Sequence, residues 1–245
     1  MTPQHQSGMP KAPRFSKVGS CILGFCLLSA QLVATHPAGA ADASGAVPPK
    51  YRAFVPETAY SGVIDDPDGY VNLRAAKRAD APVVAKVKAG EQFSFGREGG
   101  DDWCRVKLAT GKSGWMHYSR IRLFYTKDDL PAKSDEGDEI EKQARDHGAD
   151  YYQITRGAVR GQLEARKKFF SVSEYADGAG AEEHWGILGV VIHLIGDEAL
   201  ARFLGGQPVA YRKSVRASFA DEVTYPFEPR EYLQRHFPKT ARILY

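Results

Sequence analysis

Between residues 61 and 125 the sequence runs as short segments in which apolar and polar residues alternate, each ended by a turn signal. The segments read GYVNLR, PVVAKVKAG, EQFSFGREGG, DWCRVKLATG and SGWMHYSRIRLFY. Such alternation is typical of half-buried β-strands, because successive side chains point to opposite faces of a sheet. Five short strands at this spacing predict a small barrel rather than a sandwich.

The first segment shows how such a strand begins. In DPDGYVNLR, residues 66–74, the turn signals Asp-Pro and Asp-Gly are followed at once by Tyr-Val-Asn-Leu. The chain is therefore expected to leave a tight loop at Gly69 and to enter a strand. Leu73 is predicted to point into the barrel, with Asn72 and Arg74 pointing away from it.

This region resembles the bacterial SH3 domain, SH3b. The resemblance rests on four ordered stretches, DPDGYVNLR at 66–74, PVVAKVKAGEQF at 82–93, DDWCRVKL at 101–108 and GKSGWMHYSRI at 111–121. It implies a small all-β, SH3-like barrel at 61–125. It also implies ligand binding, often to a cell-wall peptide or to a protein partner, although domains of one fold differ in what they bind.

Beyond a charged linker at 126–138, TKDDLPAKSDEGD, the pattern changes to helical periodicity. Residues 139–245 predict an all-α domain, a bundle of five or six short helices. The nearly all-apolar segment from Trp185 to Ile195 is typical of a helix buried in the middle of such a bundle. The fold class is thus multidomain, with the barrel followed by the helical domain.

Local signals predict where these helices begin and end. Gly148 interrupts the first helical segment, and Asp150 is a good N-cap for the piece that follows. Asp197 is expected to cap the helix EALARFL, which Gly205-Gly206 would end. Other signals are Pro208 near the start of VAYRKSVRASFAD, Pro229 at the start of REYLQRHF and Pro238 at its end.

Residues 1–40 have the three-part plan of a secretory signal peptide. A basic segment with Lys11, Arg14 and Lys17 precedes the apolar run VGSCILGFCLLSAQLVA, and Ala38-Gly39-Ala40 offers a cleavage site. The alternative is a retained membrane anchor, for which this run is short. We therefore expect an exported protein, periplasmic or secreted, with a flexible leader at 41–60 and no stable transmembrane anchor after cleavage.

Cleavage changes the charge and cysteine counts. The whole chain has 33 basic and 30 acidic residues, and losing three basic ones would leave equal numbers. A neutral protein offers no electrostatic case for binding nucleic acid or anionic lipid. Cys21 and Cys26 would leave with the signal peptide, so Cys104 alone cannot form an internal disulfide.

The sequence gives little support for a catalytic cysteine or for metal-binding histidines. Cys104 lies inside the strand WCRV rather than at a helix start beside a histidine, so we expect it to be a packed core residue. In the helical region, His184 and His193 are nine residues apart and fall on opposite sides of a helix, which is not metal-ligand spacing. His193 is expected to be a hydrogen-bonded core residue, with Asp197 as a possible partner. His236 is expected to be a helix-end cation favoured by the dipole.

The aromatic residues of the barrel are the better candidates for function. Tyr70, Trp103, Trp115 and Tyr118 are predicted to line a shallow ligand-binding groove, because aromatics with polar tips suit such surfaces. The alternative is that Trp103 and Trp115 simply fill the core.

These features favour a non-enzymatic, exported envelope protein of a bacterium. Its SH3b domain would bind a cell-wall peptide or an envelope protein, and its helical domain would make a second interaction. No catalytic motif, metal site or cofactor site is predicted. The alternative is a cell-envelope hydrolase that uses Glu182, Glu183 or His184, and a third possibility is a regulatory partner of an envelope enzyme.

Overall fold

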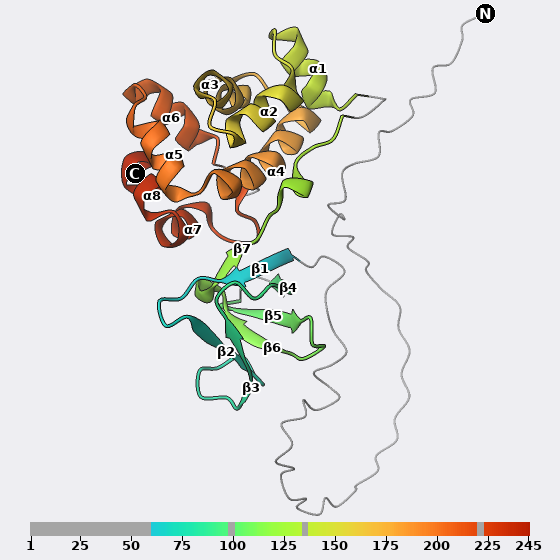
Figure 1. Ribbon diagram of the computed structural model, residues 1–245, viewed down its shortest axis with the longest axis vertical. Helices are drawn as coiled ribbons and strands as arrows, with labels where there is room; N and C mark the ends of the chain where they lie inside the picture. The colour runs from blue at the N-terminus through green and yellow to red at the C-terminus, as the bar shows by residue number, and fades with distance from the viewer. Residues whose placement is uncertain (1–59, 98–100, 134–136, 220–222) are drawn as a thin grey trace, which may run out of the picture.

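The computed structural model describes residues 60–97, 101–133, 137–219 and 223–245 (Figure 1). These residues form a curled β-sheet at 60–123, the sheet unit, followed by eight α-helices, the helical unit. The predicted signal peptide at 1–40 lies outside the described residues, as does nearly all of the predicted leader at 41–60.

The sheet unit is an antiparallel sheet of seven strands in the order β3-β2-β6-β5-β4-β1-β7 across the described residues. The strands are β1 (Tyr60–Ile64), β2 (Tyr70–Arg74), β3 (Val83–Lys88), β4 (Phe93–Arg97), β5 (Trp103–Leu108), β6 (Ser113–His117) and β7 (Ile121–Leu123). Each predicted segment contains a strand, and the last contains two, separated by a 3-10 turn at Tyr118–Arg120. β1 was not among the predicted strands.

The inward faces of the strands form the core that the alternation predicts. Leu73 is fully buried, as are Phe95, Val106 and Met116 on the neighbouring strands. β2 and β6 approach so closely at Gly114 that a Cβ there would lie 2.5 Å from the carbonyl oxygen of Arg74. A glycine is therefore required where these two strands meet.

The helical unit contains eight helices within the described residues. They are α1 (Glu139–Asp146), α2 (Tyr151–Val159), α3 (Leu163–Ser171), α4 (Gly178–Ile195), α5 (Asp197–Gly205), α6 (Val209–Ala217), α7 (Pro229–His236) and α8 (Pro238–Leu244). This exceeds the five or six that were predicted, while a regular bundle arrangement stays a prediction. The break at Gly148 is confirmed, and the Asp150 carboxylate accepts the Gln153 N–H at 2.9 Å.

Helix α4 lies at the centre of the helical unit, as its apolar sequence predicts. It contacts α1, α2 and α5, and most of its second half is buried. Gly189 on α4 lets the chain at Val223 pass close by, since a Cβ there would be 2.5 Å from the Val223 carbonyl oxygen.

The prediction that Asp197 caps its own helix is wrong. The N-cap of α5 is Gly196, and Asp197 instead accepts hydrogen bonds from the N–H groups of Lys239 and Thr240, at 3.0 and 2.8 Å. These are the second and third residues of α8, a helix that was not predicted. Asp197 thus satisfies free N–H groups at the start of a helix 42 residues away and ties α5 to α8.

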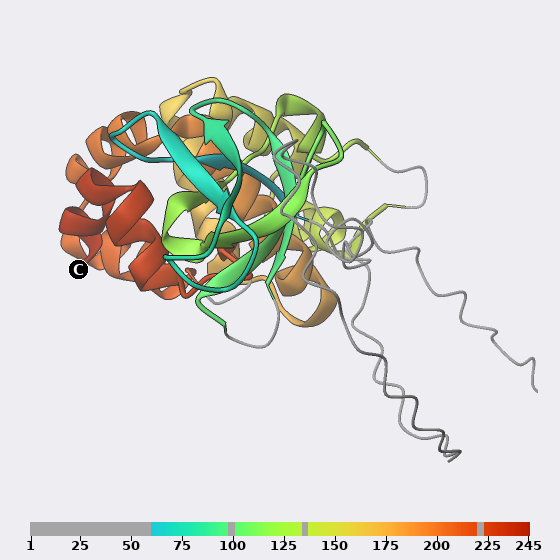
Figure 2. The same ribbon diagram turned by 90° about the horizontal axis from the view of Figure 1, so that it is seen from below.

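The sheet unit packs against α7 and the segment that precedes it, with β1 and β7 on the side nearest the helices (Figures 1 and 2). The Phe227 ring lies between Phe95 of β4 and Tyr232 of α7, with ring centroids 5.7 and 5.4 Å away. The Arg97 guanidinium donates a hydrogen bond to the Pro226 carbonyl at 2.8 Å.

A series of buried hydrogen bonds also connects the sheet unit to the helical unit. The Leu123 N–H of β7 donates to the Tyr232 hydroxyl at 2.8 Å, and that hydroxyl is 2.7 Å from Nε2 of His193 on α4. Nδ1 of His193 lies 2.7 Å from the Gly189 carbonyl, which can only accept, so the imidazole carries its proton on Nδ1. Tyr232 therefore donates to Nε2, and three elements are joined without a charge.

Candidate functional site

A surface pocket of about 440 Å³ lies on the sheet unit. It is lined by Asp66, Asp68, Tyr70, Val71, Asn72, Arg74, Ala79, Trp103, His117, Ser119 and Arg120, all from the sheet unit. We call it the aromatic pocket. Its wall comes from the loop before β2, from β2 itself, from the start of β5 and from the turn after β6.

The loop that opens the pocket is the Asp-Pro-Asp-Gly turn. The Asp68 N–H donates to the Asp66 carboxylate and the Gly69 N–H to the Asp66 carbonyl, both at 3.0 Å. Gly69 has φ +74°, a conformation that favours glycine. The Asp66 carboxylate, which is 5% exposed, also pairs with Arg120 from beyond β6, so this turn is held against the opposite wall.

Two of the predicted groove residues, Tyr70 and Trp103, line this pocket. Tyr70 is 41% exposed, and Nζ of Lys86 lies 4.3 Å from the centroid of its ring. Trp103 is half-buried and meets the His117 ring edge-on, with centroids 5.6 Å apart. Neither ring is part of the buried core, so the alternative that Trp103 only fills the core does not describe its position.

The other two predicted residues face elsewhere. Trp115 is half-buried beneath two cations, with Lys77 at 4.4 Å and Arg105 at 5.1 Å from its ring. Tyr118 turns toward the helical unit, where its hydroxyl donates to Glu231 at 3.1 Å and its ring stacks on Phe227. The structure therefore brings together two of the four predicted residues and not all of them.

The pocket also holds polar groups that the sequence analysis did not select. Oδ1 of Asn72 is buried and has no hydrogen-bond partner among the described residues. Nδ1 of His117 accepts the Ser119 N–H at 3.2 Å, so its proton is on Nε2, and burial lowers the pKa of this imidazole. The neutral ring thus offers an N–H donor, while Asn72 offers an acceptor.

The sequence pattern accounts for these polar residues as turn and strand positions and gives them no binding role. Asp66 and Asn72 belong to the stretch that marks the strand start, and His117 follows Gly-Trp-Met in the last segment. The available signal is that Asp66, Asp68 and Asn72 lie close to Tyr70 in the sequence, while His117 ends the segment that pairs with the strand of Trp103.

Cys104 is a packed core residue, as predicted. It is fully buried in β5, and burial raises the pKa of its thiol to about 12. A thiol that is protonated at neutral pH and shielded from solvent is a poor nucleophile.

His184 and His193 of α4 are buried, and their partners differ in part from those predicted. His193 is a hydrogen-bonded core residue, as predicted, but it bonds to Tyr232 and Gly189 rather than to Asp197. Nδ1 of His184 is 3.0 Å from the Tyr151 hydroxyl. Burial lowers the pKa of each imidazole to about 3, so both rings are neutral.

His236 lies in the last turn of α7, as predicted, but the prediction that it is a cation is wrong. Its Nδ1 is 2.9 Å from the Asp65 carboxylate of the sheet unit, and its side chain is nearly fully buried. Burial lowers the pKa of His236, although Asp65 opposes this change. The hydrogen bond from His236 in turn lowers the pKa of Asp65.

Glu182, Glu183 and His184 do not form a cluster of converging groups. Glu182 is exposed, whereas His184 is fully buried. Glu183 is half-buried and accepts the Ile140 N–H at 3.1 Å, and burial raises the pKa of its carboxyl group. Across the described ranges, no three histidine, cysteine or acidic side chains are placed to hold a metal ion.

Among the helices that the structure describes, none is both long and apolar enough to span a membrane. Comparison with curated proteins gave no match, and comparison with solved structures gave none. Comparison with family models gave one assignment: the model of the bacterial SH3 domain matches residues 69–122. The match runs from the glycine of the Asp-Pro-Asp-Gly turn to β7 and thus covers most of the sheet unit. Residues 69–122, which supply nearly the whole wall of the aromatic pocket, are therefore a bacterial SH3 domain.

Proposed function

We propose that this chain is an exported, non-enzymatic protein of the bacterial envelope whose SH3 domain binds a cell-wall peptide or an envelope protein. The observation that carries the proposal is the aromatic pocket. It combines two partly exposed aromatic rings with unpaired polar groups, and most of its wall comes from the residues that match the bacterial SH3 domain.

The pocket chemistry suits a peptide. Tyr70 and Trp103 supply flat apolar surfaces with polar tips, which are common at the centres of binding sites. The buried acceptor on Asn72 and the N–H of His117 match the donors and acceptors of a peptide backbone. The carboxylate of Asp68, exposed at the mouth, favours a ligand that carries an amine.

In this proposal the helical unit presents the SH3 domain in a set orientation and offers a second surface. Support comes from the contact between the two units, where Phe227, Tyr232 and Arg97 pack or bond across the boundary. The hydrolase alternative has one supporting observation, the raised pKa of Glu183. Neither Glu183 nor His184 lines the aromatic pocket, so we give binding priority.

The test is co-sedimentation of the whole chain with insoluble peptidoglycan sacculi. We expect Trp103→Ala and Tyr70→Ala to weaken binding by about tenfold or more, because central aromatic residues usually contribute over 1.4 kcal/mol. The matched control is Leu163→Ala, which removes an exposed apolar side chain from α3 and should bind as the original chain does. Circular dichroism verifies folding of each variant. If the original chain stays in the supernatant, the cell-wall ligand is excluded and an envelope protein becomes the ligand to seek.

A further inference from the structure

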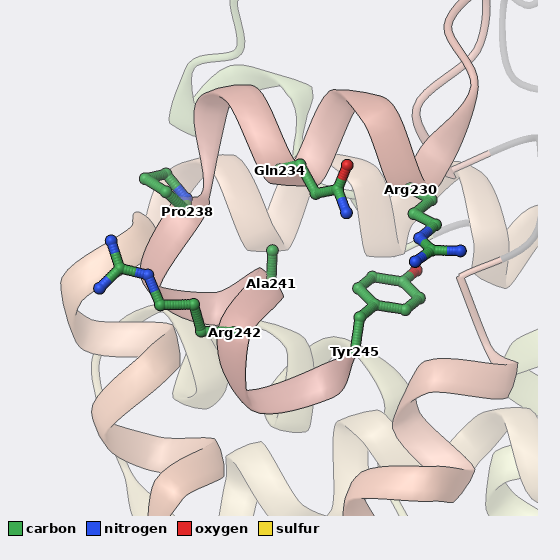
Figure 3. A pocket seen from close by; sticks show the side chains of 6 residues that line it. All are labelled: Arg230, Gln234, Pro238, Ala241, Arg242 and Tyr245. Carbon is green, nitrogen blue, oxygen red and sulfur yellow. The ribbon is translucent and has the colours of Figure 1, made fainter.

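A second cavity lies on the helical unit, far along the chain from the SH3 domain. It has a volume of about 390 Å³ and lies between α7 and α8. Its lining consists of Arg230, Gln234, Pro238, Ala241, Arg242 and Tyr245 (Figure 3). We call it the arginine pocket. Figure 3 shows Arg230 beside Tyr245 at one end, Arg242 beside Pro238 at the other, and the Gln234 amide between them.

The polar groups of the arginine pocket are not used by the fold. Arg242 and Gln234 make no side-chain hydrogen bond or ion pair with any part of the chain that the structure describes. Arg230 lies over the ring of Tyr245, with its guanidinium carbon 5.5 Å from the ring centroid. Lys239, which follows Pro238 in α8, is paired with Glu198.

The charge around this pocket is positive. No aspartate or glutamate is among its lining residues. Burial raises the pKa of the Tyr245 hydroxyl, while the charges of Arg216 on α6 and of Arg230 partly oppose this rise and Glu228 adds to it. Two guanidinium groups, those of Arg230 and Arg242, therefore line the pocket with no carboxylate side chain among its lining residues.

The chemistry of these groups defines the ligand. Two guanidinium groups, an amide and a phenol present many N–H and O–H donors, and guanidinium groups bind the oxygens of phosphate with two parallel hydrogen bonds. The Tyr245 ring, Pro238 and Ala241 add apolar surface, and the volume exceeds that of a lone anion. The site thus suits a phosphate group attached to a small organic part.

We propose that the arginine pocket binds a phosphate ester, which would be either a soluble molecule or the headgroup of an anionic lipid. The site is independent of the SH3 domain. It would give the helical unit a binding function of its own.

The soluble source is tested by isothermal titration calorimetry of the whole chain with glycerol 3-phosphate, with glycerol as the ligand lacking phosphate. We expect binding of glycerol 3-phosphate only. Arg230→Gln and Arg242→Gln should each weaken it about tenfold, as expected for the loss of a charge-assisted hydrogen bond. The control is Arg160→Gln, which removes the same charge from an exposed position at the end of α2.

The lipid source is tested by flotation of the whole chain with vesicles of phosphatidylcholine, with and without phosphatidylglycerol. If binding to the phosphatidylglycerol vesicles falls at least threefold in Arg230→Gln and Arg242→Gln but not in Arg160→Gln, the lipid is the source. The proposal is overturned if neither probe binds in a manner that depends on Arg230 and Arg242. Circular dichroism of all variants excludes unfolding as the cause of any loss.

Discussion

At the scale of single residues, Tyr232 has the most consequential position in the molecule. Its hydroxyl accepts from Leu123 of the sheet unit and donates to His193 at the centre of the helical unit. Both partners are buried, so neither can turn to water if the hydroxyl is removed. Removing such a hydroxyl destabilises the protein mainly because the buried groups that it paired with lose their hydrogen-bond partner.

Tyr232→Phe should therefore lower the free energy of unfolding by about 1–3 kcal/mol, the range for a buried polar group left without a partner. The measurement is urea denaturation followed by circular dichroism. Tyr70→Phe is the matched control, since its ring is 41% exposed and its hydroxyl makes no hydrogen bond within the described residues. Equal stability of the two variants would contradict the role assigned to Tyr232.

At the scale of elements, the strand pair β2–β6 and the helix pair α5–α8 show which features local sequence patterns predict and which they do not. The turn at Gly69 and the alternation in β2 follow from neighbouring residues, and the structure has both. The contact of β2 with Gly114 of β6, and the bond from Asp197 to α8, join positions about 40 residues apart. No periodicity or capping rule encodes such a pairing.

Gly114→Ala should destabilise the sheet unit by about 1–3 kcal/mol, because its methyl group would overlap the Arg74 carbonyl and force the strands apart. Gly205→Ala, at the end of α5, is the comparison. The nearest atom there is a methyl carbon of Ile243 at 3.7 Å, so the substitution should be neutral or slightly stabilising. Thermal denaturation of both variants, with the melting temperature of each compared with that of the original chain, tests this prediction. A stable Gly114→Ala protein would mean that the two strands separate easily.

At the scale of the whole molecule, the sheet and helical units meet through aromatic packing and neutral hydrogen bonds. Phe227 is stacked between the two units, and Tyr232 links both to α4. His193 lies at this contact and must stay neutral to accept the hydrogen bond from Tyr232, so stability depends on pH.

Lowering the pH should reduce the free energy of unfolding, and the loss should begin at pH values well above those at which carboxylates titrate. His184 and His193 have a pKa of about 3 when folded and 6.5 when exposed. Between these values the unfolded chain binds protons that the native chain does not. Stability is therefore complete above about pH 7 and falls as the pH drops toward 3, by at most about 1.4 kcal/mol per pH unit for each histidine.

Chemical denaturation at pH 7, 6, 5 and 4 measures this slope. His193→Gln removes one of the two imidazoles whose pKa is lowered to about 3 and should flatten the dependence, even though it lowers stability at pH 7. An unchanged slope in this variant would show that His193 is not protected from protons in the folded state.

Local sequence patterns predict the strands β2 to β5, the helix break at Gly148, the helix start at Pro229 and the buried helix α4, because each depends on neighbouring residues. They also led to the SH3 resemblance and to Tyr70 and Trp103. Packing between distant elements, by contrast, sets which way Tyr118 faces, which helix Asp197 caps, and that Asn72 and His117 share a pocket with Trp103. The physical reason is that these contacts join residues distant in the chain, so side-chain packing between elements selects them and local pattern does not.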